Sequence, residues 1–177
     1  IVSGGRVFAM DSATAVSAFD AKTGKKFWRV ELTPAEEDGD DNIGGGLAFE
    51  NGVVFATTGF AQVIAIEAAS GKILWRKQVA GPMRTAPTVR AGRVFAITVD
   101  SHLYALDARD GTEIWSYTGI SEVASLLGGA SPAVDAGVVV APFASGELIA
   151  LKAENGRVLW NDSLATARRT DVVSTMA

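Results

Sequence analysis

The feature that most constrains this chain is one stretch that occurs four times and ends each time in tryptophan. The clearest copy is Ala105-Leu106-Asp107-Ala108-Arg109-Asp110-Gly111-Thr112-Glu113-Ile114-Trp115. The other copies span 18–28, 65–75 and 150–160, so all four tryptophans of the chain close a copy: Trp28, Trp75, Trp115 and Trp160. A repeat of this kind decides the architecture before any single residue is interpreted.

The repeating unit extends further back than this motif. A glycine lies 23 residues before every tryptophan, at Gly5, Gly52, Gly92 and Gly137. The spacing from each tryptophan to the next of these glycines is instead variable, at 24, 17 and 22 residues. The constant segment is therefore a rigid unit, and the variable stretches are loops on one face of the array.

Each unit reads as a set of short strands. Runs such as Gly92-Arg93-Val94-Phe95-Ala96 are rich in β-branched and aromatic residues and follow a turn glycine, which predicts a strand. A second strand follows, then a hairpin turn such as Asp110-Gly111 and a strand that carries the tryptophan. With one more strand before each glycine, we predict an all-β fold, a β-propeller of four-stranded antiparallel blades. The blades are expected at about 1–32, 44–80, 84–118 and 129–164, with 165–177 leading to the next blade.

The tryptophans are expected to wedge neighbouring blades together. Small alanines recur at fixed offsets from the glycines, and large rings set against small residues let layers interlock. Replacing a buried tryptophan by alanine costs about 3–5 kcal/mol in protein cores, so we interpret the four tryptophans as structural docking residues.

Composition narrows the function classes. The chain has no cysteine, which excludes disulfides, thiolate metal sites and thiol nucleophiles. The net charge of −4 and the lack of a basic stripe argue against a nucleic-acid partner. No apolar run approaches the ~18 residues of a membrane span. The chain starts at Ile1, and we interpret it as a fragment or processed product. Its outermost blades expose apolar faces, so we expect it either to self-associate or to behave poorly alone.

Three sets of residues could form a metal or catalytic site, and we interpret each of them as structural or solvent-exposed instead. His102 is the only histidine, and we interpret it as a surface turn residue, since zinc sites draw on several such ligands. The run from Glu36 to Asn42 alternates acids like a calcium loop but lacks the glycine and glutamate of that loop, which favours a solvated loop. Acids just before the motif turns, at Asp20, Glu67 and Asp107, are expected to bind turn backbone. No catalytic residue, cofactor site or metal site is predicted.

The motif Ala-x-Asp-x-x-x-Gly-x-x-x-Trp resembles the tryptophan-docking motif of PQQ-type, quinoprotein-like β-propeller repeats. The copies ending at Trp28 and Trp115 match it in full, whereas Glu67 and Lys152 replace the aspartate in the other two. The resemblance implies that four blades of an eight-bladed ring are present. Two classes share this repeat. Quinoprotein dehydrogenases hold pyrroloquinoline quinone and calcium and typically carry a vicinal disulfide, whereas BamB-like lipoproteins serve outer-membrane protein assembly without a cofactor.

The compact blades and absent cysteines favour the BamB-like class. This resemblance implies a non-catalytic scaffold at the periplasmic face of the outer membrane of a Gram-negative bacterium, anchored by a lipid outside this segment. The implied partner is a BamA-like assembly subunit, bound by loops between blades. The alternatives are a fragment of a quinoprotein dehydrogenase and another periplasmic protein-binding propeller.

Two stretches correspond to the partner-binding loops of the resemblance. The leucine-rich loop maps onto 124–128, where Leu126 keeps a leucine and Leu127 occupies the position of the arginine. From the residues alone, this leucine pair is either an exposed anchor for a partner or a plug of the propeller. The acidic loop maps onto 168–177, with Arg168, Arg169 and Asp171 as candidates.

Overall fold

The structure is a computed structural model, which describes residues 1–35, 44–120 and 130–163. Within these ranges the chain forms sixteen strands in four four-stranded sheets. The described residues form no helix, and so none that is long and apolar enough to cross a membrane.

Each sheet is built from four strands that are consecutive in the chain. The first sheet contains β1 (Val2–Ser3), β2 (Arg6–Met10), β3 (Ala15–Asp20) and β4 (Lys26–Glu31). The second contains β5 (Gly45–Glu50), β6 (Val53–Thr58), β7 (Gln62–Glu67) and β8 (Ile73–Gln78). The third contains β9 (Thr88–Arg90), β10 (Arg93–Ile97), β11 (His102–Asp107) and β12 (Glu113–Thr118). The fourth contains β13 (Ala133–Asp135), β14 (Val138–Pro142), β15 (Glu147–Lys152) and β16 (Val158–Ser163).

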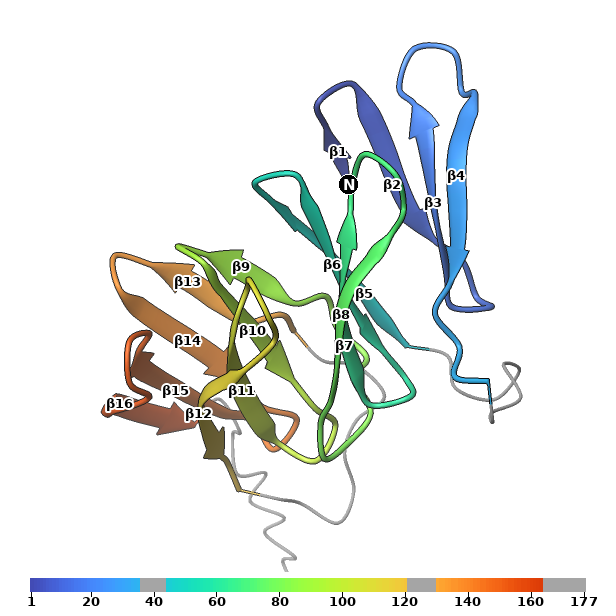
Figure 1. Cartoon of the computed structure of the whole chain (residues 1–177). Helices are drawn as coiled ribbons and strands as arrows, with labels where there is room; N and C mark the ends of the chain where they lie inside the picture. The colour runs from blue at the N-terminus through green and yellow to red at the C-terminus, as the bar shows by residue number, and fades with distance from the viewer. Residues whose placement is uncertain (36–43, 121–129, 164–177) are drawn as a thin grey trace, which may run out of the picture.

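The sheets are antiparallel meanders that follow one another in chain order (Figure 1). The first strands of the second, third and fourth sheets contact one another, because β9 lies against both β5 and β13. Buried apolar clusters fill each of the three spaces between neighbouring sheets. The predicted all-β fold of four-stranded antiparallel blades is confirmed.

The glycine that opens each unit is required by a two-residue hairpin. Both central residues of the hairpin between the first two strands have positive φ, as at Ala91 (52°) and Gly92 (72°). Such primed turns match the twist of paired strands but favour glycine. The Gly92 carbonyl also accepts a hydrogen bond of 2.9 Å from the Ala108 N–H, and the same contact recurs in the other three sheets. This bond ties the start of each unit to its motif turn and explains their constant separation.

The tryptophans join neighbouring sheets through one repeated contact. The indole Nε1 of Trp28, Trp75 and Trp115 donates to the carbonyl of Ala68, Ala108 and Ala153 respectively, at 3.1 Å each time. Each ring also covers the motif glycine of the next sheet: a Cβ on Gly111 would lie 2.7 Å from Trp75, and a Cβ on Gly156 would lie 2.8 Å from Trp115. Each of these three rings therefore lies between two described sheets, and their docking role stays a prediction that the substitutions below test.

At the two outer sheets, no described residue completes the same contact. Trp160 of the last sheet is 47% exposed, compared with 9% for Trp75 and Trp115. Gly24 of the first sheet has the same conformation as the other motif glycines, with φ of 70°, but no atom lies within 4 Å of a Cβ built there. We call the contact of a tryptophan ring with the motif glycine of the next sheet the interlock. The last sheet thus presents its tryptophan and the first sheet presents its glycine.

Candidate partner-binding face

The described residues that enter and leave the connections between sheets lie at one end of the sheets, which is called the connection face here. Because each sheet is a four-stranded antiparallel meander, its last strand ends at the same end at which the next sheet begins. The turns between the second and third strands lie at this end as well. The opposite end, called the hairpin end, carries the two-residue hairpins. Loops held on a rigid scaffold are the usual place for recognition.

The start of each connection, called its root here, is held in place by a backbone hydrogen bond. In each of the first three sheets, a residue just after the last strand donates its backbone N–H to a carbonyl in the turn between the second and third strands. The pairs are Leu32 to Thr14 at 3.1 Å, Val79 to Ala61 at 2.9 Å and Gly119 to Ser101 at 2.8 Å. The three acceptor residues all have positive φ, which turns their carbonyls toward the departing chain.

The connection at 79–87, between the second and third sheets, is held along its length. Met83 is fully buried, and its N–H donates to the Thr58 carbonyl at 3.1 Å. The buried Thr57 hydroxyl donates to the Thr85 carbonyl at 2.6 Å. The intervening residues Ala80, Pro82 and Arg84 are exposed. This connection therefore presents a short row of outward side chains on a fixed backbone.

The third connection joins the third and fourth sheets, and a hydrogen bond holds the chain near each of its two ends. The buried Glu147 carboxylate accepts a hydrogen bond of 3.0 Å from the Ile120 N–H, across 27 residues of sequence. Burial raises the pKa of the nearby Tyr117 hydroxyl, and the negative charge of Glu147 adds to this effect. At the other root, the Thr88 hydroxyl donates to the Pro132 carbonyl. Ile120 itself is 64% exposed, so its backbone is held while its apolar side chain is open to solvent on the connection face.

The sequence-predicted partner residues Leu126, Leu127, Arg168, Arg169 and Asp171 lie outside the described residues. On the connection face the structure describes the exposed Ile120, which precedes the first of these stretches, and Glu147, whose carboxylate accepts a hydrogen bond from the Ile120 N–H. The only sequence signal for this pair was Glu147 itself, an acid at the start of the apolar strand Glu147–Lys152.

The turn acids have the backbone role expected of them, with one variation. Asp20 accepts from the N–H groups of Lys22 at 3.0 Å and Thr23 at 2.7 Å. Asp107 binds both the side chain and the N–H of Arg109, and these contacts lower the pKa of Asp107 to about 2. Glu67 accepts from the hydroxyl of Ser70 instead, because its longer side chain replaces that of aspartate.

His102 differs from the expected surface turn residue. It begins β11, its side chain is only 29% exposed, and its ring stacks on Tyr104. Its Nδ1 lies 3.2 Å from a carboxylate oxygen of Asp100. Among the described residues no group of three or more His, Cys, Asp or Glu side chains could hold a metal ion. The acidic run 36–42 lies in 36–43, outside the described ranges.

Comparison with known proteins places this geometry in a family. The family model for outer membrane protein assembly factor BamB matches residues 3–177, nearly the whole chain. The chain belongs to the BamB family. An outer membrane protein assembly factor BamB from Yersinia pestis is 30% identical over 135 residues, covering 74% of this chain and 34% of that relative.

Solved structures agree on the fold. The crystal structure of BamB from Moraxella catarrhalis matches with a TM-score of 0.82 and 23% identity, over 94% of this chain and 48% of that one. The quinohemoprotein alcohol dehydrogenase from Comamonas testosteroni matches with a TM-score of 0.72 and 19% identity, over 92% of this chain and 34% of that one. The chain thus spans about a third of the Yersinia relative and about half of the solved BamB.

Proposed function

We propose that this chain is part of a non-catalytic scaffold that serves the assembly of outer-membrane β-barrel proteins. The observation that carries the proposal is the BamB family match over residues 3–177. The architecture supports it, since rigid sheets hold the connections between them at fixed roots. On this proposal the protein works at the periplasmic side of the outer membrane of a Gram-negative bacterium, tethered by a lipid anchor outside this segment.

The proposed partner is a BamA-like assembly subunit that binds the connection face. Exposed residues of the 79–87 connection, such as Pro82 and Arg84, and the exposed Ile120 supply the described part of the contact. A backbone that is already fixed loses little entropy on binding, which favours affinity. The candidates Leu126, Leu127, Arg168, Arg169 and Asp171 extend the proposed surface and are to be tested with it.

The experiment is affinity capture of partners from outer-membrane extracts by the full-length protein, with the captured proteins identified by mass spectrometry. We expect the BamA-like subunit to be recovered, and recovery to fall for Ile120→Ser. The matched control is Ile114→Ser, because Ile114 is also exposed, at 42%, but lies within β12 of the same sheet.

A quinone reconstitution assay on the same preparation tests the main alternative, a quinoprotein dehydrogenase. Dye-linked alcohol oxidation after addition of pyrroloquinoline quinone and calcium, without capture of an assembly subunit, would overturn the proposal. Equal loss of capture in the two isoleucine variants would instead reject Ile120 as a contact residue.

A further inference from the structure

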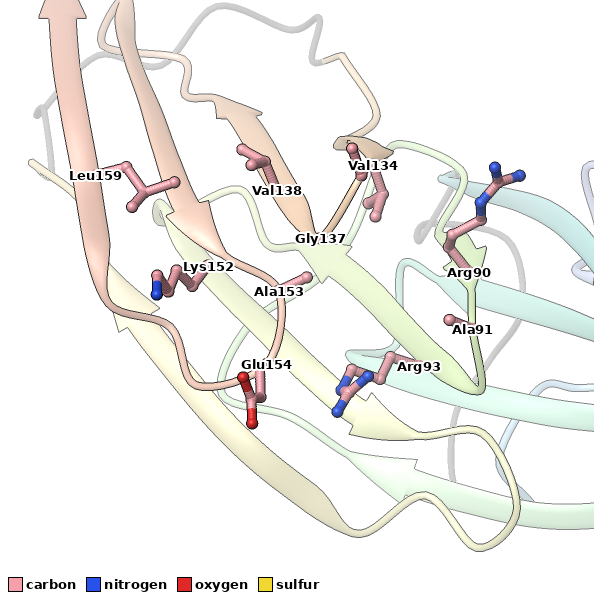
Figure 2. A pocket seen from close by; sticks show the side chains of 11 residues that line it. Arg90, Ala91, Arg93, Val134, Gly137, Val138, Lys152, Ala153, Glu154 and Leu159 are labelled. Atoms are coloured by element: carbon pink, nitrogen blue, oxygen red, sulfur yellow. The ribbon is translucent and has the colours of Figure 1, made fainter.

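A second candidate site lies at the hairpin end, away from the connection face. A cavity of about 360 Å³ opens between the third and fourth sheets (Figure 2). Its walls come from the β9–β10 hairpin, the β13–β14 hairpin, the turn after β15 and one residue of β16. Ligand pockets typically measure about 300–1,000 Å³, so this cavity is large enough for a small ligand or the end of a peptide.

The central feature of this cavity is Arg93, whose guanidinium has no hydrogen-bond acceptor among the described residues. Its Nε is buried without a partner. The repeat itself provides a comparison, since Arg6 occupies the same place in the first sheet within the same Gly-Arg-Val-Phe-Ala sequence. Arg6 donates to the carbonyls of Ala68 at 2.6 Å and Ala69 at 3.0 Å in the next sheet. Arg93 makes no such contact with the corresponding residues of the fourth sheet, although it lines the cavity beside them.

A buried N–H donor without an acceptor is costly, and an arginine fork matches the two oxygens of a carboxylate. Asp107 lies opposite Arg93 in the sheet and feels its charge, but the Asp107 carboxylate is hydrogen-bonded to Arg109 at 2.7 Å and forms no hydrogen bond with Arg93. Arg93 is thus a cation whose hydrogen-bonding capacity is left for a ligand.

The charges around the cavity leave an excess of one positive charge. Lys152 lines it at the motif position that is acidic in the other three copies, and its ammonium group has no ion-pair partner among the described residues. Arg90 also lines the cavity and pairs with Asp135 at 3.5 Å, and Glu154 adds one further carboxylate. Three cations face two carboxylates, so a monoanion balances the site better than a dianion does.

Apolar side chains complete the walls. Val134 and Val138 line the cavity, and Leu159 lies across from the arginines (Figure 2). We propose that this cavity binds a carboxylate attached to a branched aliphatic group, with Arg93 gripping the carboxylate and the valine and leucine side chains packing on the aliphatic part. A free small acid and the C-terminus of a peptide share this chemistry.

The test is a titration of the 177-residue chain with N-acetyl-leucine and with a short peptide ending in leucine, monitored by calorimetry and by methyl NMR. Each probe is paired with its C-terminal amide, and inorganic phosphate serves as a dianionic probe. We expect the free carboxylates to bind with shifts at the Leu159 and Val134 methyl groups. Binding of N-acetyl-leucine alone identifies a small-acid site, whereas tighter binding of the peptide identifies a C-terminus.

Substitutions of Arg93 test whether its guanidinium binds the carboxylate. Arg93→Gln should weaken carboxylate binding about tenfold or more, and Arg93→Lys should restore part of it, because lysine keeps the charge but not the fork. Arg6→Gln is the matched control and should bind as the parent chain does. If Arg93→Gln does not fold, Lys152→Gln tests the same site, with weaker binding expected.

Equal binding of acid and amide would overturn the proposal, as would stronger binding of phosphate or binding unaffected by these variants. Because the cavity lies at the hairpin end, such a result would leave the proposed scaffold function untouched. Loss of partner capture would conversely leave this site standing.

Discussion

A methyl group added to a motif glycine tests the interlock between neighbouring sheets. In Gly111→Ala the new Cβ would lie 2.7 Å from the ring of Trp75, and φ at this position is 75°. Two costs follow. The left-handed backbone costs an alanine about 1–2 kcal/mol, and the collision with a packed ring adds about 1–3 kcal/mol of overpacking. If the ring withdraws, its hydrogen bond of 3.1 Å to the Ala108 carbonyl is weakened as well.

The chain contains the control that separates these two costs. Gly24 has nearly the same φ, 70°, but nothing lies within 4 Å of its Cβ position, so Gly24→Ala carries the backbone cost alone. Urea denaturation of the 177-residue chain, followed by tryptophan fluorescence, should find Gly111→Ala less stable than Gly24→Ala by about 1–3 kcal/mol. Equal destabilisation by the two substitutions would refute the reasoning, since it would mean that the ring does not depend on the bare glycine.

Three further predictions concern the tryptophans and one turn acid. Trp115→Phe should lose the hydrogen bond to the Ala153 carbonyl, about 1 kcal/mol, together with part of the ring packing, and should cost less than Trp115→Ala, about 3–5 kcal/mol; both are measured by thermal unfolding. The exposed Trp160 should promote concentration-dependent self-association of the chain in sedimentation velocity, which Trp160→Ser should reduce; a monodisperse parent chain would contradict this. Because the folded-state pKa of Asp107 is lowered to about 2, Asp107→Asn should destabilise the chain above pH 3.8, and the difference should shrink as the pH falls toward 2; a constant difference would exclude this role.

The repeat made the fold predictable because its constraints are local. The constant separation of glycine and tryptophan reflects a positive-φ hairpin, such as that at Gly92, and a backbone bond from that glycine to the motif alanine. Both are set by nearby residues. The small alanines also follow this logic, except for Ala9 and Ala21 of the first sheet, which are exposed. Ala9 is exposed whereas its counterpart Ala56 is buried, because Ala56 faces the first sheet and no described sheet covers Ala9.

The candidate sites were less predictable because they depend on contacts between distant residues. The bond from Ile120 to Glu147 joins two sheets, and sequence spacing gives no indication of which residue lies opposite. Arg6 and Arg93 share one local sequence but differ in their partners, because the neighbouring sheet decides what each guanidinium meets. His102 was interpreted as a surface turn residue for a similar reason. The sequence does not show that Tyr104 and Asp100 partly enclose its side chain.

The most direct test of the proposed function is the affinity of the full-length protein for the purified periplasmic domains of a BamA-like subunit, measured by surface plasmon resonance. The account predicts specific binding that is weakened by Ile120→Ser on the connection face and unchanged by Arg93→Gln at the hairpin end. Absence of binding, or binding that depends on the hairpin end rather than the connection face, would contradict it.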